Sequence, residues 1–160
     1  MWFKNLRLFS LIQPFDLSLE ELESQLADHT FIPCANYEKS RIGWVSPLGN
    51  SALVDEEDGV APMLTRTVGD YIMLCAQKQD RLLPASVVRE ATEEKVAELE
   101  VRQARKVYRK EKREIQDNVF ASLLPRAFTR SARTFAYISR TEKLLVVDAA
   151  SAPKAEEFLN

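Results

Sequence analysis

Apolar and polar residues alternate in several short segments of the chain, a pattern typical of strands that are buried on one face. Together with short apolar runs, this pattern predicts strands within residues 2–13, 31–34, 42–45, 63–77, 132–138 and 143–148. A turn at Gly69–Asp70 divides the fourth segment into two strands, and a turn at Ser139–Glu142 joins the last two. Because short turns favour antiparallel neighbours, the pattern predicts a mixed, mostly antiparallel sheet.

Two short helices are predicted near the ends of the chain. The first has leucines at helical spacing up to Ala27 and is capped by Asp16 or Ser18. The second is capped by Ser151 and has a proline in its first turn. Asn160 comes barely two turns into this second helix, so we expect the helix to be cut short there.

The longest helical pattern starts at Pro84 and ends before Pro125. Residues 85–124 contain no Gly or Pro and are dominated by strong helix formers. One unbroken helix of this length would reach about 60 Å, which is wider than a domain of this size. We therefore favour two helices joined around residues 109–113, although a single projecting helix stays open.

One apolar stripe runs along this helical pattern at steps of mostly three and four residues. Its members are Ala97, Val101, Ala104, Tyr108, Ile115 and Val119. The predicted fold is α+β, a mixed, mostly antiparallel sheet with a long or bent basic helical excursion. Within residues 1–160, the core is expected over about 1–84 and 126–160, and the helical excursion over about 85–125. The acidic residues of segment 51–61 predict a mobile loop.

Charge is distributed unevenly along the chain. The 160 residues carry 22 Lys+Arg and 24 Asp+Glu, which gives a net charge of −2. Residues 102–143 hold 12 of these cations against 4 acidic residues, whereas the remainder holds 10 against 20. A basic segment of this kind favours a polyanionic partner, and the alternative is an ordinary solvated helix face.

Two groups of cations are candidate contacts for a phosphate backbone. The first group contains seven cations within twelve residues: Arg102, Arg105, Lys106, Arg109, Lys110, Lys112 and Arg113. On a continuous helix, five of these would share one side and form a ridge of long, flexible cations. The second group follows the proline: Arg126, Arg130, Arg133 and Arg140. Neither group resembles a base-reading helix, and the alternative is that the arginines pair with acidic residues.

The sequence offers little material for catalysis or metal binding. His29 is the single histidine, and Cys34 and Cys75 lie among apolar residues, which predicts buried, reduced thiols rather than a disulfide. Asp148, at a predicted strand end, is the one weak candidate for a metal-dependent nuclease. We therefore expect no catalytic residue, no metal and no cofactor.

The N-terminus lacks the layout of a signal peptide, and no apolar run is long enough to span a membrane. We therefore do not expect a transmembrane protein, and the two buried thiols predicted above suit a reducing cytoplasm.

Phe128 lies between Arg126 and Arg130, in a polar stretch. Such a phenylalanine is either tucked under the end of the preceding helix or exposed as an anchor for a partner. Physical reasoning alone favours the tucked position.

The segment Leu123-Leu124-Pro125-Arg126-Ala127-Phe128-Thr129-Arg130-Ser131 resembles the N-terminal half of the recombination-associated protein RdgC family. Ordered matches extend along the chain, at residues 1–6, 31–34, 43–45, 75–84, 94–97, 103–106 and 147–152. The region 47–66 is less similar to the family, in agreement with its prediction as a loop.

The resemblance implies sequence-independent binding of double-stranded DNA by a ring-shaped homodimer in the cytoplasm, on the nucleoid. It also implies antagonism of RecA-driven strand exchange, and hence modulation of homologous recombination and replication. By position in the motif, Phe128 would lie at a dimer contact, Arg126 near that contact or the DNA, and Arg105 and Lys106 in a basic stretch of the family.

Family chains are about twice as long as this one, so a closed ring would need the other half. Two alternatives stay open: a nuclease, after the family's older label, and a protein-interaction domain that uses the basic helix.

Overall fold

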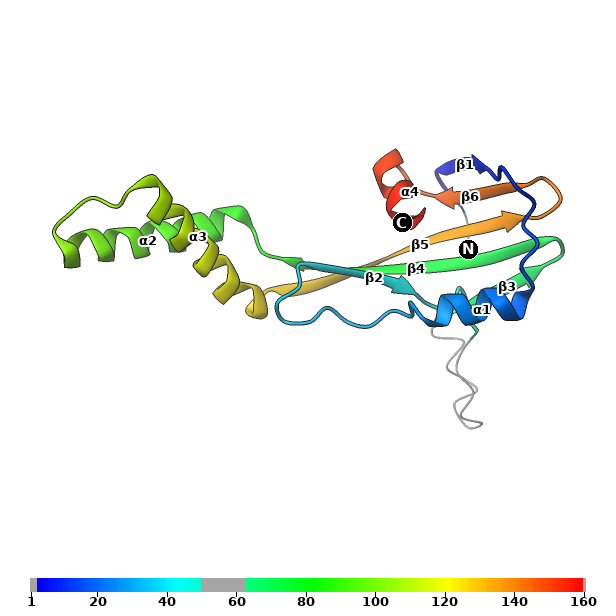
Figure 1. Ribbon diagram of the computed structural model, residues 1–160, viewed down its shortest axis with the longest axis horizontal. Coiled ribbons are helices and arrows are strands. Elements are labelled where there is room, and N and C mark those ends of the chain that lie inside the picture. Colours follow the sequence, from blue (N-terminus) through cyan, green and yellow to red (C-terminus); the bar gives the residue numbers. More distant parts are fainter. Residues whose placement is uncertain (1–2, 50–62, 160) are drawn as a thin grey trace, which may run out of the picture. The chain divides into compact units, whose positions relative to one another are not determined.

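The computed structural model describes residues 3–49 and 63–159 (Figure 1). Its elements in chain order are β1 (Leu6–Ser10), α1 (Leu19–Ala27), β2 (Ser40–Trp44), β3 (Thr65–Val68), β4 (Tyr71–Leu82), α2 (Ala85–Gln103), α3 (Arg109–Leu123), the 3₁₀ helix η2 (Leu124–Arg126), β5 (Phe128–Ser139), β6 (Leu144–Asp148) and α4 (Ala152–Leu159). The predicted acidic loop, residues 51–61, lies outside the described residues. No helix in the described part of the chain is both long and apolar enough to cross a membrane.

The strands form one sheet in the order β1-β6-β5-β4-β2, with β3 paired to β4. The pairs β1–β6, β5–β6 and β3–β4 are antiparallel. Both predicted hairpins are confirmed, and the turn between β3 and β4 is at Gly69–Asp70. Gly69 has a φ of +60°, which glycine adopts at little cost. The predicted α+β fold is therefore confirmed.

The chain divides into two compact units. We call residues 1–32, 42–78 and 131–160 the sheet unit, and residues 33–41 and 79–130 the helical unit. Strands β4 and β5 each contribute residues to both. Each unit is described separately below.

The hydrophobic core of the sheet unit lies between one face of the sheet and the helices α1 and α4 (Figure 1). α1 contributes Leu22 and Leu26, and α4 contributes Phe158, whose ring meets that of Trp44 edge to face at 5.1 Å. Ser18 caps α1 through a capping box: its Oγ accepts from the Glu21 N–H, and the Glu21 carboxylate accepts from the Ser18 N–H. Both predicted terminal helices are confirmed.

The predicted strand at residues 31–34 is wrong. The chain pairs with β2 only around Thr30, where the Trp44 N–H donates to the His29 carbonyl and the Phe31 N–H donates to the Trp44 carbonyl. The backbone of Phe31 passes so close to Gly43 that a Cβ there would lie 2.5 Å from the Phe31 Cα. Pro33 has no N–H to continue a ladder, so pairing stops after a single bridge.

The helical excursion consists of two helices, as favoured from the sequence, and α2 and α3 pack against each other (Figure 1). The joint is at residues 104–108 rather than around 109–113. Ala104, the C-cap of α2, has the left-handed conformation with a φ of +52°. This conformation ends α2 without the glycine that helices usually place there.

The predicted apolar stripe is confirmed on α3, where Val119 is buried and Ile115 is half-buried. It is wrong before α3, because Val88 and Thr92 are the buried residues of α2 and Val101 and Tyr108 are 84% and 72% exposed. The stripe assumed one continuous helix, and the reversal of the chain after Gln103 changes which residues face a neighbour.

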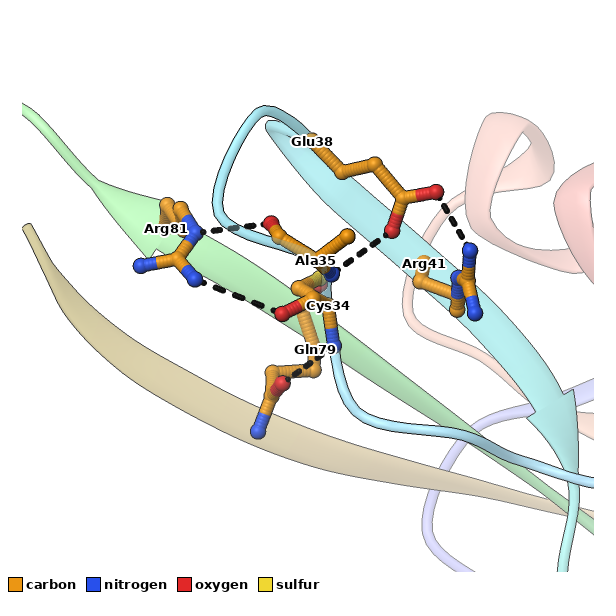
Figure 2. A network of polar contacts seen from close by, with 6 residues as sticks. All are labelled: Cys34, Ala35, Glu38, Arg41, Gln79 and Arg81. Carbon is orange, nitrogen blue, oxygen red and sulfur yellow. Dashed lines mark hydrogen bonds and ion pairs between the residues drawn. The ribbon is translucent and has the colours of Figure 1, made fainter. Parts of the chain in front are cut away.

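The guanidinium of Arg81 connects two separate segments of the helical unit. It donates to the carbonyls of Cys34 and Ala35 (Figure 2) and to the Asn36 side chain at 3.2–3.3 Å. Its Nη1 also lies 3.3–3.5 Å from three carbonyl oxygens at the end of the helical excursion, those of Leu124, Pro125 and Ala127. Carbonyls at a helix C-terminus lack intrahelical donors and are stabilised by a nearby cation.

The segment that Arg81 meets is also held by side chains (Figure 2). The Gln79 side-chain oxygen accepts from the Cys34 N–H at 2.8 Å. The Glu38 carboxylate accepts from the Ala35 N–H at 2.9 Å and pairs with Arg41. Lys39 places its ammonium 4.4 Å from the centre of the Phe120 ring of α3.

We predict that Arg81→Lys lowers the free energy of unfolding of the helical unit by about 1.5–3 kcal/mol, the range for hydrogen bonds to charged groups. A lysine keeps the charge, but it cannot reach acceptors on both segments as the planar guanidinium does. Urea unfolding followed by helical circular dichroism measures the effect. Arg89→Lys is the control, because Arg89 is exposed on α2 and forms no hydrogen bond or ion pair with the described residues. Equal stability of the two variants would contradict the prediction.

Candidate nucleic-acid interface

The helical unit carries nine of the predicted phosphate contacts. Arg102 is in the last turn of α2, and Arg105 and Lys106 lie in the connection to α3. Four more are in the first turns of α3, and Arg126 and Arg130 lie in η2 and β5. The continuous ridge expected from helical spacing is wrong, because α2 ends at Gln103 and α3 begins at Arg109.

Seven of these cations are exposed and form no hydrogen bond or ion pair with any described residue. They are Arg102, Arg109, Lys110, Lys112, Arg113, Arg126 and Arg130. Their charges are therefore available to a ligand. Exposed lysines and arginines of this kind are the groups that neutralise backbone phosphates.

Arg105 and Lys106 instead pair with acidic residues. Sequence analysis gave such pairing as the alternative to phosphate binding. The two terminal nitrogens of Arg105 donate to the two carboxylate oxygens of Glu111 at 2.9 and 2.7 Å. Lys106 donates to Glu100 at 2.9 Å. The guanidinium of Arg105 also lies 5.9 Å from the centre of the Tyr108 ring.

Glu100 and Glu111 also accept from the backbone of the connection. The Val107 N–H donates to Glu100 and the Tyr108 N–H donates to Glu111, both at 3.0 Å. Each carboxylate thus holds one cation and one N–H of the same short segment. These bonds lower the pKa of Glu111 to about 2, chiefly through Arg105, and lower the pKa of Glu100, chiefly through the Val107 N–H.

The overall charge of the helical unit agrees with an anion-binding role. Its residues include 14 Lys+Arg and 10 Asp+Glu, whereas the sheet unit has 8 and 14. The negative net charge of the whole chain therefore comes from the sheet unit.

Two predicted cations, Arg133 and Arg140, belong to the sheet unit. Arg133 donates to the Gln77 side chain at 3.0 Å. Arg140 donates to the Leu17 carbonyl at 2.9 Å and lies 5.8 Å from the centre of the Phe15 ring. Both have structural partners in their own unit.

Phe128 is 85% exposed, so the tucked position expected from physical reasoning alone is wrong. It is the first residue of β5, and its neighbours on that strand up to Arg133 are exposed as well. The end of the preceding helix therefore does not cover the ring. Its exposure is compatible with the partner contact that the family resemblance implies.

The side chains considered for chemistry have structural roles. The carboxylate of Asp148 accepts from the N–H groups of Lys4 and Asn5 at 3.2 and 2.8 Å, next to the start of β1. Cys34 and Cys75 are buried free thiols, as predicted, and burial raises the pKa of Cys75 to about 11. Within residues 3–49 and 63–159, no three potential ligands of the His, Cys, Asp and Glu types cluster as a metal site would need.

Sequence reasoning missed Arg81, Glu100 and Glu111. The pairs Glu100–Lys106 and Arg105–Glu111 are six residues apart, which is not a spacing at which side chains meet on a helix. The spacing would have become informative only if the break at Ala104 had been known.

The comparison with protein families identifies the class to which this chain belongs. The family model described as "Putative exonuclease, RdgC" matches residues 1–160, and the chain therefore belongs to the RdgC family.

Individual relatives carry the name "Recombination-associated protein RdgC". The protein from Aeromonas hydrophila subsp. hydrophila is 42% identical over 159 residues, which are 99% of this chain and 50% of the relative. The protein from Tolumonas auensis is 42% identical over 162 residues, covering 100% of this chain and 50% of the relative. The chain thus spans about half the length of the curated relatives it matches.

We predict that the carboxyl group of Glu111 titrates near pH 2 rather than near its ordinary value of 4.5. Because folding lowers this pKa, the stabilisation is complete above about pH 4.5 and is lost as the pH falls towards 2. NMR titration of the Glu111 side-chain carboxyl carbon gives the midpoint. Arg105→Lys should raise the midpoint and Arg109→Lys should not; a wild-type midpoint of 4.5 would refute the assignment.

Proposed function

We propose that this chain is a sequence-independent binding module for double-stranded DNA that acts in homologous recombination. The observation that carries the proposal is the set of seven exposed cations without protein partners on the helical unit. Each can neutralise a phosphate and release a condensed counterion, which makes binding favourable and dependent on salt.

The chemistry of these side chains also supports the absence of sequence preference. Bases are read by bidentate pairs of Arg, Asn or Gln inserted into a groove. The α3 helix instead begins with Arg109, Lys110, Lys112 and Arg113 around a single acidic residue, Glu111. Such a helix start suits contacts to phosphate oxygens, which occur at every nucleotide.

The name of the relatives places them in recombination, and the family resemblance suggests how DNA binding would act there. In this proposal a ring-shaped homodimer encircles the duplex and restrains RecA by occupying DNA, in the cytoplasm and on the nucleoid. Phe128 is the proposed dimer contact, because a phenylalanine exposed to this degree is an apolar anchor available to a partner. Ring closure would require the half that the chain does not span.

We predict that the chain binds random-sequence duplexes with an affinity that falls steeply as salt rises. Arg109→Ala/Arg113→Ala removes two free cations and should reduce the log–log salt slope by about 1.8, since each phosphate contact contributes about 0.9. Fluorescence anisotropy across a salt series measures the slope.

Lys4→Ala/Lys154→Ala is the matched control, because it removes two exposed cations from the sheet unit. It should leave the slope unchanged, and duplexes of different sequence should bind alike. Binding that is absent at low salt, or that does not respond to salt, would refute the proposed function.

The proposed role is not catalytic, although the description of the family model includes the word exonuclease. Asp148, the candidate from the sequence, holds two backbone N–H groups next to β1. We predict that an end-labelled duplex incubated with the chain and Mg²⁺ stays intact, measured as acid-soluble label. Mg²⁺-dependent release that disappears in Asp148→Asn would instead assign nuclease activity to the chain.

A further inference from the structure

The connection between α2 and α3 has a backbone conformation that its sequence does not favour. Ala104 occupies the left-handed region, which costs a residue with a Cβ more than it costs glycine. None of residues 104–108 is a glycine or a proline. Interactions outside the local backbone must therefore hold this turn.

Those interactions are the two carboxylates at its ends. Glu100, in the last turn of α2, binds the Val107 N–H and the Lys106 ammonium. Glu111, in the first turn of α3, binds the Tyr108 N–H and the Arg105 guanidinium. Tyr108 is the N-cap of α3, so Glu111 determines where that helix begins.

The two cations of the connection differ in how much of their bonding capacity is used. Both terminal nitrogens of Arg105 face Glu111, one of them also donates to the Lys106 carbonyl at 3.2 Å, and the side chain is 43% exposed. The Lys106 side chain is 90% exposed, and its ammonium spends one of three donors on Glu100. Lys106 therefore has two N–H donors left for a phosphate. The two terminal nitrogens of Arg105 already face Glu111, so a bidentate contact between Arg105 and a phosphate would displace that carboxylate.

We propose that Arg105 is a positioning residue of the anion-binding surface and does not contact phosphate. Paired with Glu111, it fixes the connection and the start of α3, and thereby the places of Arg102, Lys106, Arg109 and Lys110. This inference rests on the proposed function and refines it. The competing possibility is that Glu111 masks Arg105, which then exchanges the carboxylate for a phosphate on binding.

A charge-matched pair of variants separates the two possibilities. Glu111→Gln and Glu114→Gln remove the same charge from α3, but Glu114 is exposed and has no partner among the described residues. If Arg105 positions the surface, Glu111→Gln should bind a random duplex about two- to fivefold more weakly than Glu114→Gln, the range expected for losing one exposed ion pair. Tighter binding by Glu111→Gln, with a salt slope larger by about 0.9, would show that Arg105 is a masked contact and overturn the proposal.

A second pair keeps every charge. Arg105→Lys loses the bidentate bond to Glu111 and should weaken binding. Arg89→Lys, at an exposed position of α2 that is not among the predicted phosphate contacts, should bind like the wild type. Equal binding by Arg105→Lys and Arg89→Lys would also overturn the proposal.

Amide hydrogen exchange at Tyr108, measured without DNA, tests the positioning role independently. The exchange should be faster in Arg105→Lys and Glu111→Gln than in Glu114→Gln. If the wild-type chain bound no DNA, the proposed function would fail, but the exchange data would still decide whether Arg105 orders the connection. Exchange at Tyr108 that is unchanged in Arg105→Lys and Glu111→Gln would refute that ordering.

Discussion

The helical unit depends on one guanidinium. Arg81 lies just before α2. Its hydrogen bonds reach the segment that precedes β2 (Figure 2) and also the carbonyls at the end of the helical excursion. It therefore joins the start of the helix pair to its end. Arginine suits this position because its planar fork presents several donors in fixed directions and stays charged.

Polar bonds matter here because the helical unit buries few apolar side chains. Among the described residues, its buried hydrophobic residues are Cys34, Val88, Val119 and Leu124, whereas the sheet unit contains the large hydrophobic cluster. The two units are therefore stabilised by different interactions. Burial of apolar surface stabilises the sheet unit, whereas hydrogen bonds and ion pairs made by Arg81, Glu100 and Glu111 stabilise much of the helical unit.

The sequence predicted the features that depend on neighbours along the chain. The capping box of Ser18 and Glu21, the turn at Gly69–Asp70 and the β5–β6 hairpin each follow from a local pattern. It favoured two helices but could not place the break at Ala104. Residues 85–124 consist largely of helix formers, and the break is held by side chains six residues from their partners. Arg81 was equally hidden, since its acceptors lie more than 40 residues away in sequence.

The candidate interface shows the same division. The cations were visible as a charge pattern, and seven of them are indeed exposed and unpaired among the described residues. The sequence could not show which cations form ion pairs within the chain. The reversal of the chain after α2 brings Arg105 to Glu111 and Lys106 to Glu100. The exposure of Phe128 was also missed, since the local pattern did not show that β5 begins there with both faces open to solvent.

The small core of the helical unit has a consequence for its exposure to proteases. Segments with few buried apolar contacts open at a lower free energy than the global unfolding of a domain, and cleavage proceeds through such openings. Residues 104–108 carry two cations, Arg105 and Lys106, and lie between exposed helix ends, so a trypsin-like protease would cleave there early. A polyanion bound to the folded form would slow that cleavage. The rate of proteolysis of the helical unit would therefore indicate how much of the chain has a polyanion bound.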